Sequence, residues 1–210
     1  MGLTNREGEV SAGSGVSLVK ITDLNQLPDK LSKIPVGVLL LDSDGTTRNG
    51  RKSLLRGRPG EVPRSSLEMV EGLIGRGWQV AVVTNQPAEG HQIARFWGRI
   101  RQYPYFPEVW RRMSVPVFGA GWDFLWNRAK TWQSTLVKVL VWMEDLEMLR
   151  MGIGSLVMVG DRQGDVDFIE RLKAEMKQRV IDVSPCLMFK LPGLEDSSSM
   201  LVRRLAPLVP

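Results

Sequence analysis

The chain has 210 residues, 43% of them hydrophobic, with a formal net charge of +5 and an isoelectric point near 9.6. This composition predicts one globular domain, and its modest positive charge favours anionic substrates but falls short of indicating nucleic acid. A single cysteine, Cys186, excludes an internal disulfide and a cysteine-cluster zinc site, and a single histidine, His91, excludes multi-histidine metal sites.

The predicted elements alternate along the chain. Residues 1–17 are rich in Gly, Ser and charge and predict a flexible tail, followed by a short helix at about 22–33. Apolar runs at 36–41, 78–83 and 155–159 predict buried strands, and shorter runs at 115–118 and 180–183 predict two more. Helical periodicity covers about 65–75, 93–100 and 131–150, and returns at Phe168, Ile169 and Leu172. Residues 193–210 show no clear pattern and are expected to form a second tail.

This alternation of strands and helices predicts an α/β fold. We expect a three-layer, Rossmann-like parallel sheet with helices on both faces, formed by a single domain over residues 18–192.

Three of the buried strands end in polar or acidic residues. Asp42 and Asp44 follow the first, Thr84 and Asn85 the second, and Asp161 and Asp165 the third. Because the carboxyl ends of parallel strands meet at one edge of a sheet, these side chains are expected to converge. Four carboxylates without histidine or cysteine suit a hard, oxygen-preferring cation, of which Mg²⁺ fits best. Thr84 and the backbone N–H groups of the turns suit phosphate oxygens.

The three strand ends also carry a family resemblance. Their sequences are Asp42-Ser43-Asp44-Gly45-Thr46-Thr47, Thr84-Asn85-Gln86 and Gly160-Asp161-Arg162-Gln163-Gly164-Asp165. They resemble motifs one, two and four of the haloacid dehalogenase superfamily, in particular its phosphatases with the DxDGT signature. Within that group, the Thr-Asn-Gln and Gly-Asp-Arg sequences are similar to those of histidinol-phosphate, heptose-bisphosphate and polynucleotide 3′-phosphatases. The resemblance spans about residues 35–185 and implies a HAD-like fold.

The resemblance implies a role for each of these residues. Asp42 becomes the nucleophile that forms an aspartyl-phosphate, and Asp44 becomes the proton carrier. Mg²⁺ is expected to bind Asp42, the main-chain carbonyl of Asp44, and Asp161, with Asp165 as a direct or outer ligand. Thr84 and the main-chain N–H of Asn85 are expected to hold the phosphate.

The lysine that normally completes this set has two candidates. Lys130 stands just before the predicted helix that leads to Asp161, which is where the family places its lysine, and we favour it. The sequence there is Ala129-Lys130-Thr131 rather than the usual Lys-Pro. Lys138 is the rival, and its simpler interpretation is a solvated helix face.

The gaps between the motifs predict an enzyme without a large cap. The first gap, Thr47 to about Pro63, has room only for a flap, in which Arg48 is expected to contact substrate, and the second is filled by one helix, a bend and a strand. The heptose-bisphosphate branch usually carries a Cys/His zinc loop, which this chain lacks. We therefore expect a Mg²⁺-dependent phosphatase acting on a small phosphorylated metabolite.

Two alternatives stay open. One is a polynucleotide 3′-phosphatase, for which nucleic acid would be the partner, and the other is a catalytically silent scaffold or regulatory subunit. No apolar stretch approaches the roughly 18 residues of a membrane span, so we expect no membrane partner and a reducing, cytoplasmic setting. The sequence does not specify an oligomeric state.

Overall fold

The computed structural model describes residues 10–11, 15–43, 45–47, 62–87, 106–120, 128–146, 153–179, 181 and 183–192. Its centre is a seven-stranded sheet with the order β1-β2-β7-β6-β3-β4-β5. The strands are β1 (Val10–Ser11), β2 (Ser17–Lys20), β3 (Val38–Asp42), β4 (Gln79–Pro87), β5 (Val117–Ala120), β6 (Leu156–Gly160) and β7 (Cys186–Lys190). All neighbouring pairs are parallel except β1 with β2.

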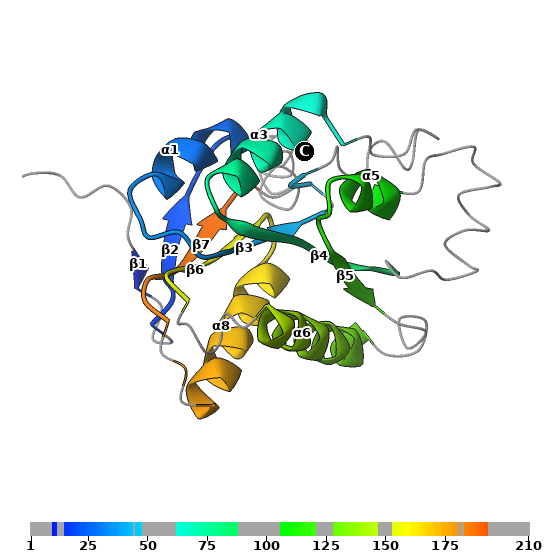
Figure 1. Ribbon diagram of the computed structural model, residues 1–210. Coiled ribbons are helices and arrows are strands. Elements are labelled where there is room, and N and C mark those ends of the chain that lie inside the picture. The colour runs from blue at the N-terminus through cyan, green and yellow to red at the C-terminus, as the bar shows by residue number, and fades with distance from the viewer. Residues whose placement is uncertain are drawn as a thin grey trace, which may run out of the picture.

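Helices cover both faces of this sheet (Figure 1). One layer holds the 3₁₀ turn η1 (Leu24–Gln26) with α1 (Leu27–Leu31), α3 (Arg64–Gly75) and α5 (Phe106–Arg112). The opposite layer holds α6 (Arg128–Asp145) and α8 (Gln163–Gln178). The predicted three-layer α/β fold with a parallel sheet is therefore confirmed.

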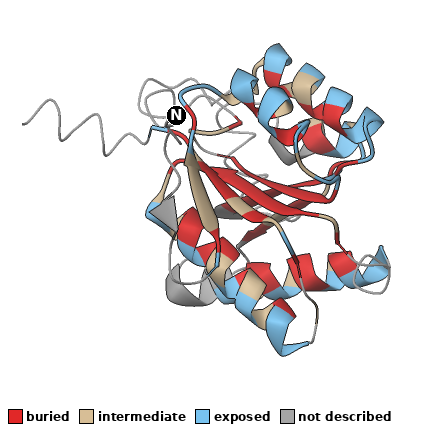
Figure 2. Cartoon of the chain, turned by 90° about the vertical axis from the view of Figure 1, so that its left-hand side faces the viewer, coloured by how far each residue is buried: buried red, intermediate tan, exposed pale blue. Residues whose placement is uncertain are grey.

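The central strand β3 is buried along its whole length. Its side chains alternate between two cores, as the two-residue repeat of a strand requires. Leu39 and Leu41 pack in the cluster that contains α1 and α3, whereas Val38 and Leu40 pack in the cluster that contains α6 and α8. Figure 2 shows the sheet and the inner faces of the helices as buried and the outer helix faces as exposed. Burying each such leucine contributes roughly 1.5–3 kcal/mol, so β3 provides a rigid base for whatever follows Asp42.

The prediction for the last strand is wrong. Ile181 and Val183 lie outside any strand, and the sheet is completed by β7 at Cys186–Lys190 instead. The residues after α8 are used to return the chain to the amino end of the sheet, where the carbonyl of Pro185 accepts a hydrogen bond from the N–H of Leu156. The predicted run at 180–183 and the β7 sequence both have the apolar composition of a strand, so composition alone does not distinguish them.

The prediction of a flexible tail over residues 1–17 is wrong for the part that the structure describes. Val10–Ser11 forms β1, and Ser17 opens β2, which pairs in parallel with β7. Val16 and Ile21, at the two ends of β2, are buried and fix the strand to the sheet. Strand β2 was not predicted, and neither was helix α5, which lies where only a bend was expected. In the described part of the chain, no helix has both the length and the apolar character needed to cross a bilayer.

Candidate metal centre

Three acidic side chains meet at one edge of the sheet. Asp42 is the last residue of β3, Asp161 directly follows β6, and Asp165 lies in the first turn of α8. One carboxylate oxygen from each lies within 4.8 Å of the others. All three residues are buried, with Asp165 only 2% exposed. Side chains of like charge are costly to bury together, so this cluster needs a proton or a cation.

The strand order explains why these residues meet. The chain leaves β3 for β4 and β5 on one side, then crosses back to β6 on the other side of β3. The helices that follow β3 and β6, α3 and α8, therefore lie on opposite faces of the sheet (Figure 1). The carboxyl ends of the two strands therefore lie at a topological switch point, which is where open α/β sheets bind ligands.

The turn after β3 is shaped around the carboxylates. The hydroxyl of Thr47 donates to the main-chain carbonyl of Asp42 at 3.0 Å, and the hydroxyl of Thr46 lies 3.4 Å from the Asp42 side chain. Gly45 has a φ of +88°, and a Cβ at this position would stand 2.5 Å from a carboxylate oxygen of Asp161. Only glycine gives this turn both the left-handed backbone and the room for Asp161.

The turn between β6 and α8 is equally close-fitting. A Cβ at Gly160 would overlap the carboxylate of Asp165. The main-chain N–H of Arg162 donates to Asp165 at 3.0 Å, and the Arg162 guanidinium Nε lies 3.6 Å from Oδ1 of Asp161. Arg162, the first of the three residues between the two acids, thus contacts both of them.

Burial raises the pKa of Asp165 from its ordinary value of 3.8 to about 7. The negative charge of Asp161 contributes to this rise in pKa, whereas the hydrogen bond from the Arg162 backbone N–H opposes it. A carboxyl group in such a position holds a proton near neutral pH unless a positive charge replaces it. The donor set therefore fits a cation.

The chemistry of the donors favours a hard cation. The three ligand side chains offer only carboxylate oxygens, which suit Mg²⁺ and not the softer metals. Of the four acids predicted to take part, Asp42, Asp161 and Asp165 are brought together. Asp44 lies outside the described residues.

The structure describes only some of the residues predicted to bind phosphate and substrate. Thr84 is buried in β4, one position beyond the residue that pairs with Asp42, so it lies at the same edge of the sheet. Asn85 also lies in β4, but its side chain is outside the described part of the structure. Arg48 lies outside the described residues, as does most of the first gap, residues 48–61. The second gap is described only in part: α5 and β5 lie within residues 106–120, while 88–105 and 121–127 lie outside the described residues.

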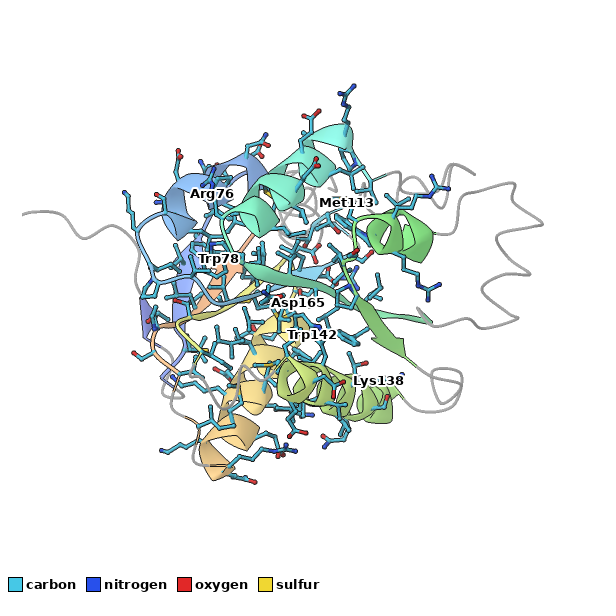
Figure 3. All side chains as sticks on the ribbon, viewed as in Figure 1. Arg76, Trp78, Met113, Lys138, Trp142 and Asp165 are labelled. Atoms are coloured by element: carbon cyan, nitrogen blue, oxygen red, sulfur yellow. The ribbon has the colours of Figure 1, made fainter. Side chains whose placement is uncertain are left out.

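The two candidate lysines are both in α6. Lys130 lies in its first turn, with its side chain outside the described part of the structure. The ammonium group of Lys138 lies 3.4 Å from the main-chain carbonyl of Gly119 in β5. Figure 3 shows Lys138 on α6, well to the side of Asp165. Lys138 therefore joins α6 to β5, a role that the interpretation as a solvated helix face did not include.

Sequence reasoning assigned no role to Arg162, although it stands between two predicted ligands. Its position at the N-cap of α8 in the Gly-Asp-Arg motif is the signal that was available. No protein-family model matches the sequence, and no curated protein matches it significantly. The family resemblance consequently rests on the three motifs alone.

Proposed function

We propose that this protein is a Mg²⁺-dependent phosphomonoester hydrolase that works through an aspartyl-phosphate. The observation that carries the proposal is the gathering of Asp42, Asp161 and Asp165 within 4.8 Å at the carboxyl ends of β3 and β6. This set offers a buried nucleophile and cation ligands in one place. Hydrolysis of a phosphomonoester requires both.

In this proposal the carboxylate of Asp42 attacks phosphorus, and the bond from phosphorus to the leaving oxygen breaks. Asp44 donates a proton to that oxygen and then removes one from the water that hydrolyses the aspartyl-phosphate. Asp161 and Asp165, with Asp42, hold the Mg²⁺. When bound, the cation offsets the negative charge of the phosphoryl oxygens and orients them.

The remaining residues bind and neutralise the phosphate. The hydroxyl of Thr84 and the main-chain N–H of Asn85 are proposed to donate to its oxygens, and Lys130 to balance the charge of Asp42 and the phosphate. Arg48 is proposed to contact the substrate.

We propose a small phosphorylated metabolite as the substrate class, in the reducing, cytoplasmic setting that the cysteine content favours. The cationic composition of the chain supports an anionic substrate, with an isoelectric point near 9.6. No contact among the described residues favours a nucleic acid.

The proposal is tested by hydrolysis of para-nitrophenyl phosphate and a panel of sugar, amino-alcohol and nucleotide phosphates, with Mg²⁺ or with a chelator. A 3′-phosphorylated oligonucleotide belongs in the panel. We expect Mg²⁺-dependent turnover that Asp42→Asn abolishes. Asp167→Asn is the matched control, since Asp167 is an exposed acid of the same helix as Asp165 and hydrogen-bonds to Gln163. The absence of hydrolysis across the panel would favour the silent scaffold, and full activity in Asp42→Asn would refute the assigned nucleophile.

A further inference from the structure

Arg162 is the residue that touches two of the three clustered acids. Its main-chain N–H donates to Asp165 at 3.0 Å, and its guanidinium Nε forms an ion pair with Oδ1 of Asp161 at 3.6 Å. The Arg162 side chain is about one third exposed, while that of Asp161 is almost fully buried. The Arg162 side chain thus reaches from a partly exposed position to a buried carboxylate.

Asp161 is also contacted at its other carboxylate oxygen. Its other carboxylate oxygen, Oδ2, lies against Gly45, where an added Cβ would stand 2.5 Å away. The Asp161 carboxylate thus contacts the turn after β3 through Oδ2 and the Arg162 side chain through Oδ1. A carboxylate contacted at both oxygens has few orientations available, and a ligand that is already oriented binds a metal ion with less loss of side-chain entropy.

We propose that Arg162 is a positioning residue that fixes Asp161 in the orientation needed to bind the cation. The inference rests on the metal centre of the proposed function. It assigns Arg162 no contact with the reacting atoms, because its effect is transmitted through Asp161.

A positioning role and a purely electrostatic role predict effects of opposite sign. A guanidinium a few ångströms from a bound divalent ion repels it, so by charge alone the loss of Arg162 would tighten cation binding by at least about threefold. If Arg162 acts by orienting Asp161, its loss weakens binding, since metal affinities fall roughly 10- to 100-fold when an outer-shell partner is removed. At a pH well above the pKa of Asp165, where no proton competes with the cation, the direction of the change therefore identifies the role.

The side chain can be tested separately from the backbone. Every replacement except proline keeps the N–H that Asp165 accepts from, so Arg162→Met removes only the guanidinium and leaves a stem of similar length. Arg171→Met is the matched control, because Arg171 is an exposed arginine of the same helix. Arg162→Lys keeps the charge with a different geometry.

The experiment measures the Kd for Mn²⁺, used as a spectroscopic substitute for Mg²⁺, from the electron paramagnetic resonance of the free ion, without substrate. We expect Arg162→Met to weaken binding at least 10-fold, Arg162→Lys to fall between it and the wild type, and Arg171→Met to stay within twofold of the wild type. Unfolding curves in chelator verify that each variant is folded, and Arg162→Gln takes the place of the Met variant if that one aggregates.

Unchanged or tighter binding by Arg162→Met overturns the positioning role while leaving the metal centre intact. A wild-type protein that binds no Mn²⁺ at millimolar concentration overturns the metal centre itself, and the role of Arg162 with it. The two failures are therefore distinguishable.

Discussion

Asp165 should make the metal-free protein less stable as the pH rises. Its pKa in the folded protein is about 7, against an ordinary value of 3.8, chiefly because the side chain is buried. Between these two values the folded protein holds a proton that the unfolded chain has released. The folded state then binds more protons than the unfolded state, so the free energy of unfolding falls as the pH rises.

The magnitude follows from the size of the shift. A difference of about three pKa units, at roughly 1.4 kcal/mol each, gives about 4 kcal/mol of lost stability above pH 7 and none below about pH 4. This is a large part of the roughly 5–15 kcal/mol by which a domain of this kind is stable. Asp165→Asn removes the penalty because asparagine carries no charge, and its carbonyl oxygen still accepts the hydrogen bond from the Arg162 N–H.

The assay is urea unfolding in chelator at pH values from 4.5 to 8, with Asp167→Asn as the control. We expect the stability of Asp165→Asn relative to the wild type to increase by about 3 kcal/mol from pH 4.5 to pH 8, and that of the control to stay level. Saturating Mg²⁺ should reduce the increase, since a cation replaces the proton. A difference between Asp165→Asn and the wild type that is flat from pH 4.5 to 8 would refute the reasoning.

Three further predictions concern neighbouring residues. Gly45→Ala should lower the free energy of unfolding by roughly 1–2 kcal/mol, measured by urea unfolding, because φ at Gly45 is +88°. The same variant should weaken Mn²⁺ binding in the resonance titration, because the new Cβ meets Asp161. Unchanged Mn²⁺ binding would contradict the packing of Gly45 against Asp161. Ser43→Ala should raise the free energy of unfolding by about 1 kcal/mol, because the Ser43 hydroxyl is buried without a hydrogen-bond partner among the described residues. A loss of stability in urea unfolding would show that the Ser43 hydroxyl does have a hydrogen-bond partner. Cys186 should react with a thiol reagent at pH 8 only as fast as the protein unfolds, because burial raises its pKa to about 11, and rapid labelling of folded protein would refute this.

The sequence predicts the central strands and the acids at their ends because an apolar run and the acid that follows it reinforce each other as signals. A continuous apolar run indicates a strand buried on both faces, and an acid at its end is then conspicuous. Asp42, Asp161 and Asp165 were identified in this way, and the structure brings them together. The parallel arrangement alone requires this convergence, so no side-chain geometry was needed to foresee it.

The outer strands could not be recognised in the same way. The residues of β2 are half-buried or exposed, and β7 mixes buried with half-buried positions. Their place in the sheet depends on backbone pairing with neighbours far along the chain, which leaves little trace in local composition. The contact of Arg162 with Asp161 and the raised pKa of Asp165 depend on side-chain direction and burial, and only the folded structure supplies these.

The pairing of β3 with β6 has a consequence for biosynthesis. Ser155, just before β6, donates a 2.6 Å hydrogen bond to the carbonyl of Pro35, just before β3, across 120 positions of the chain. Contacts this distant in sequence form late and slowly during folding. A nascent chain that ends before Asp161 carries Asp42 without its two partners, so a cation that needs all three carboxylates binds only after nearly the whole domain has been synthesised. Such a ligand stabilises the finished fold by mass action, by about 2.7 kcal/mol at 100 times its Kd, and does nothing for the incomplete one.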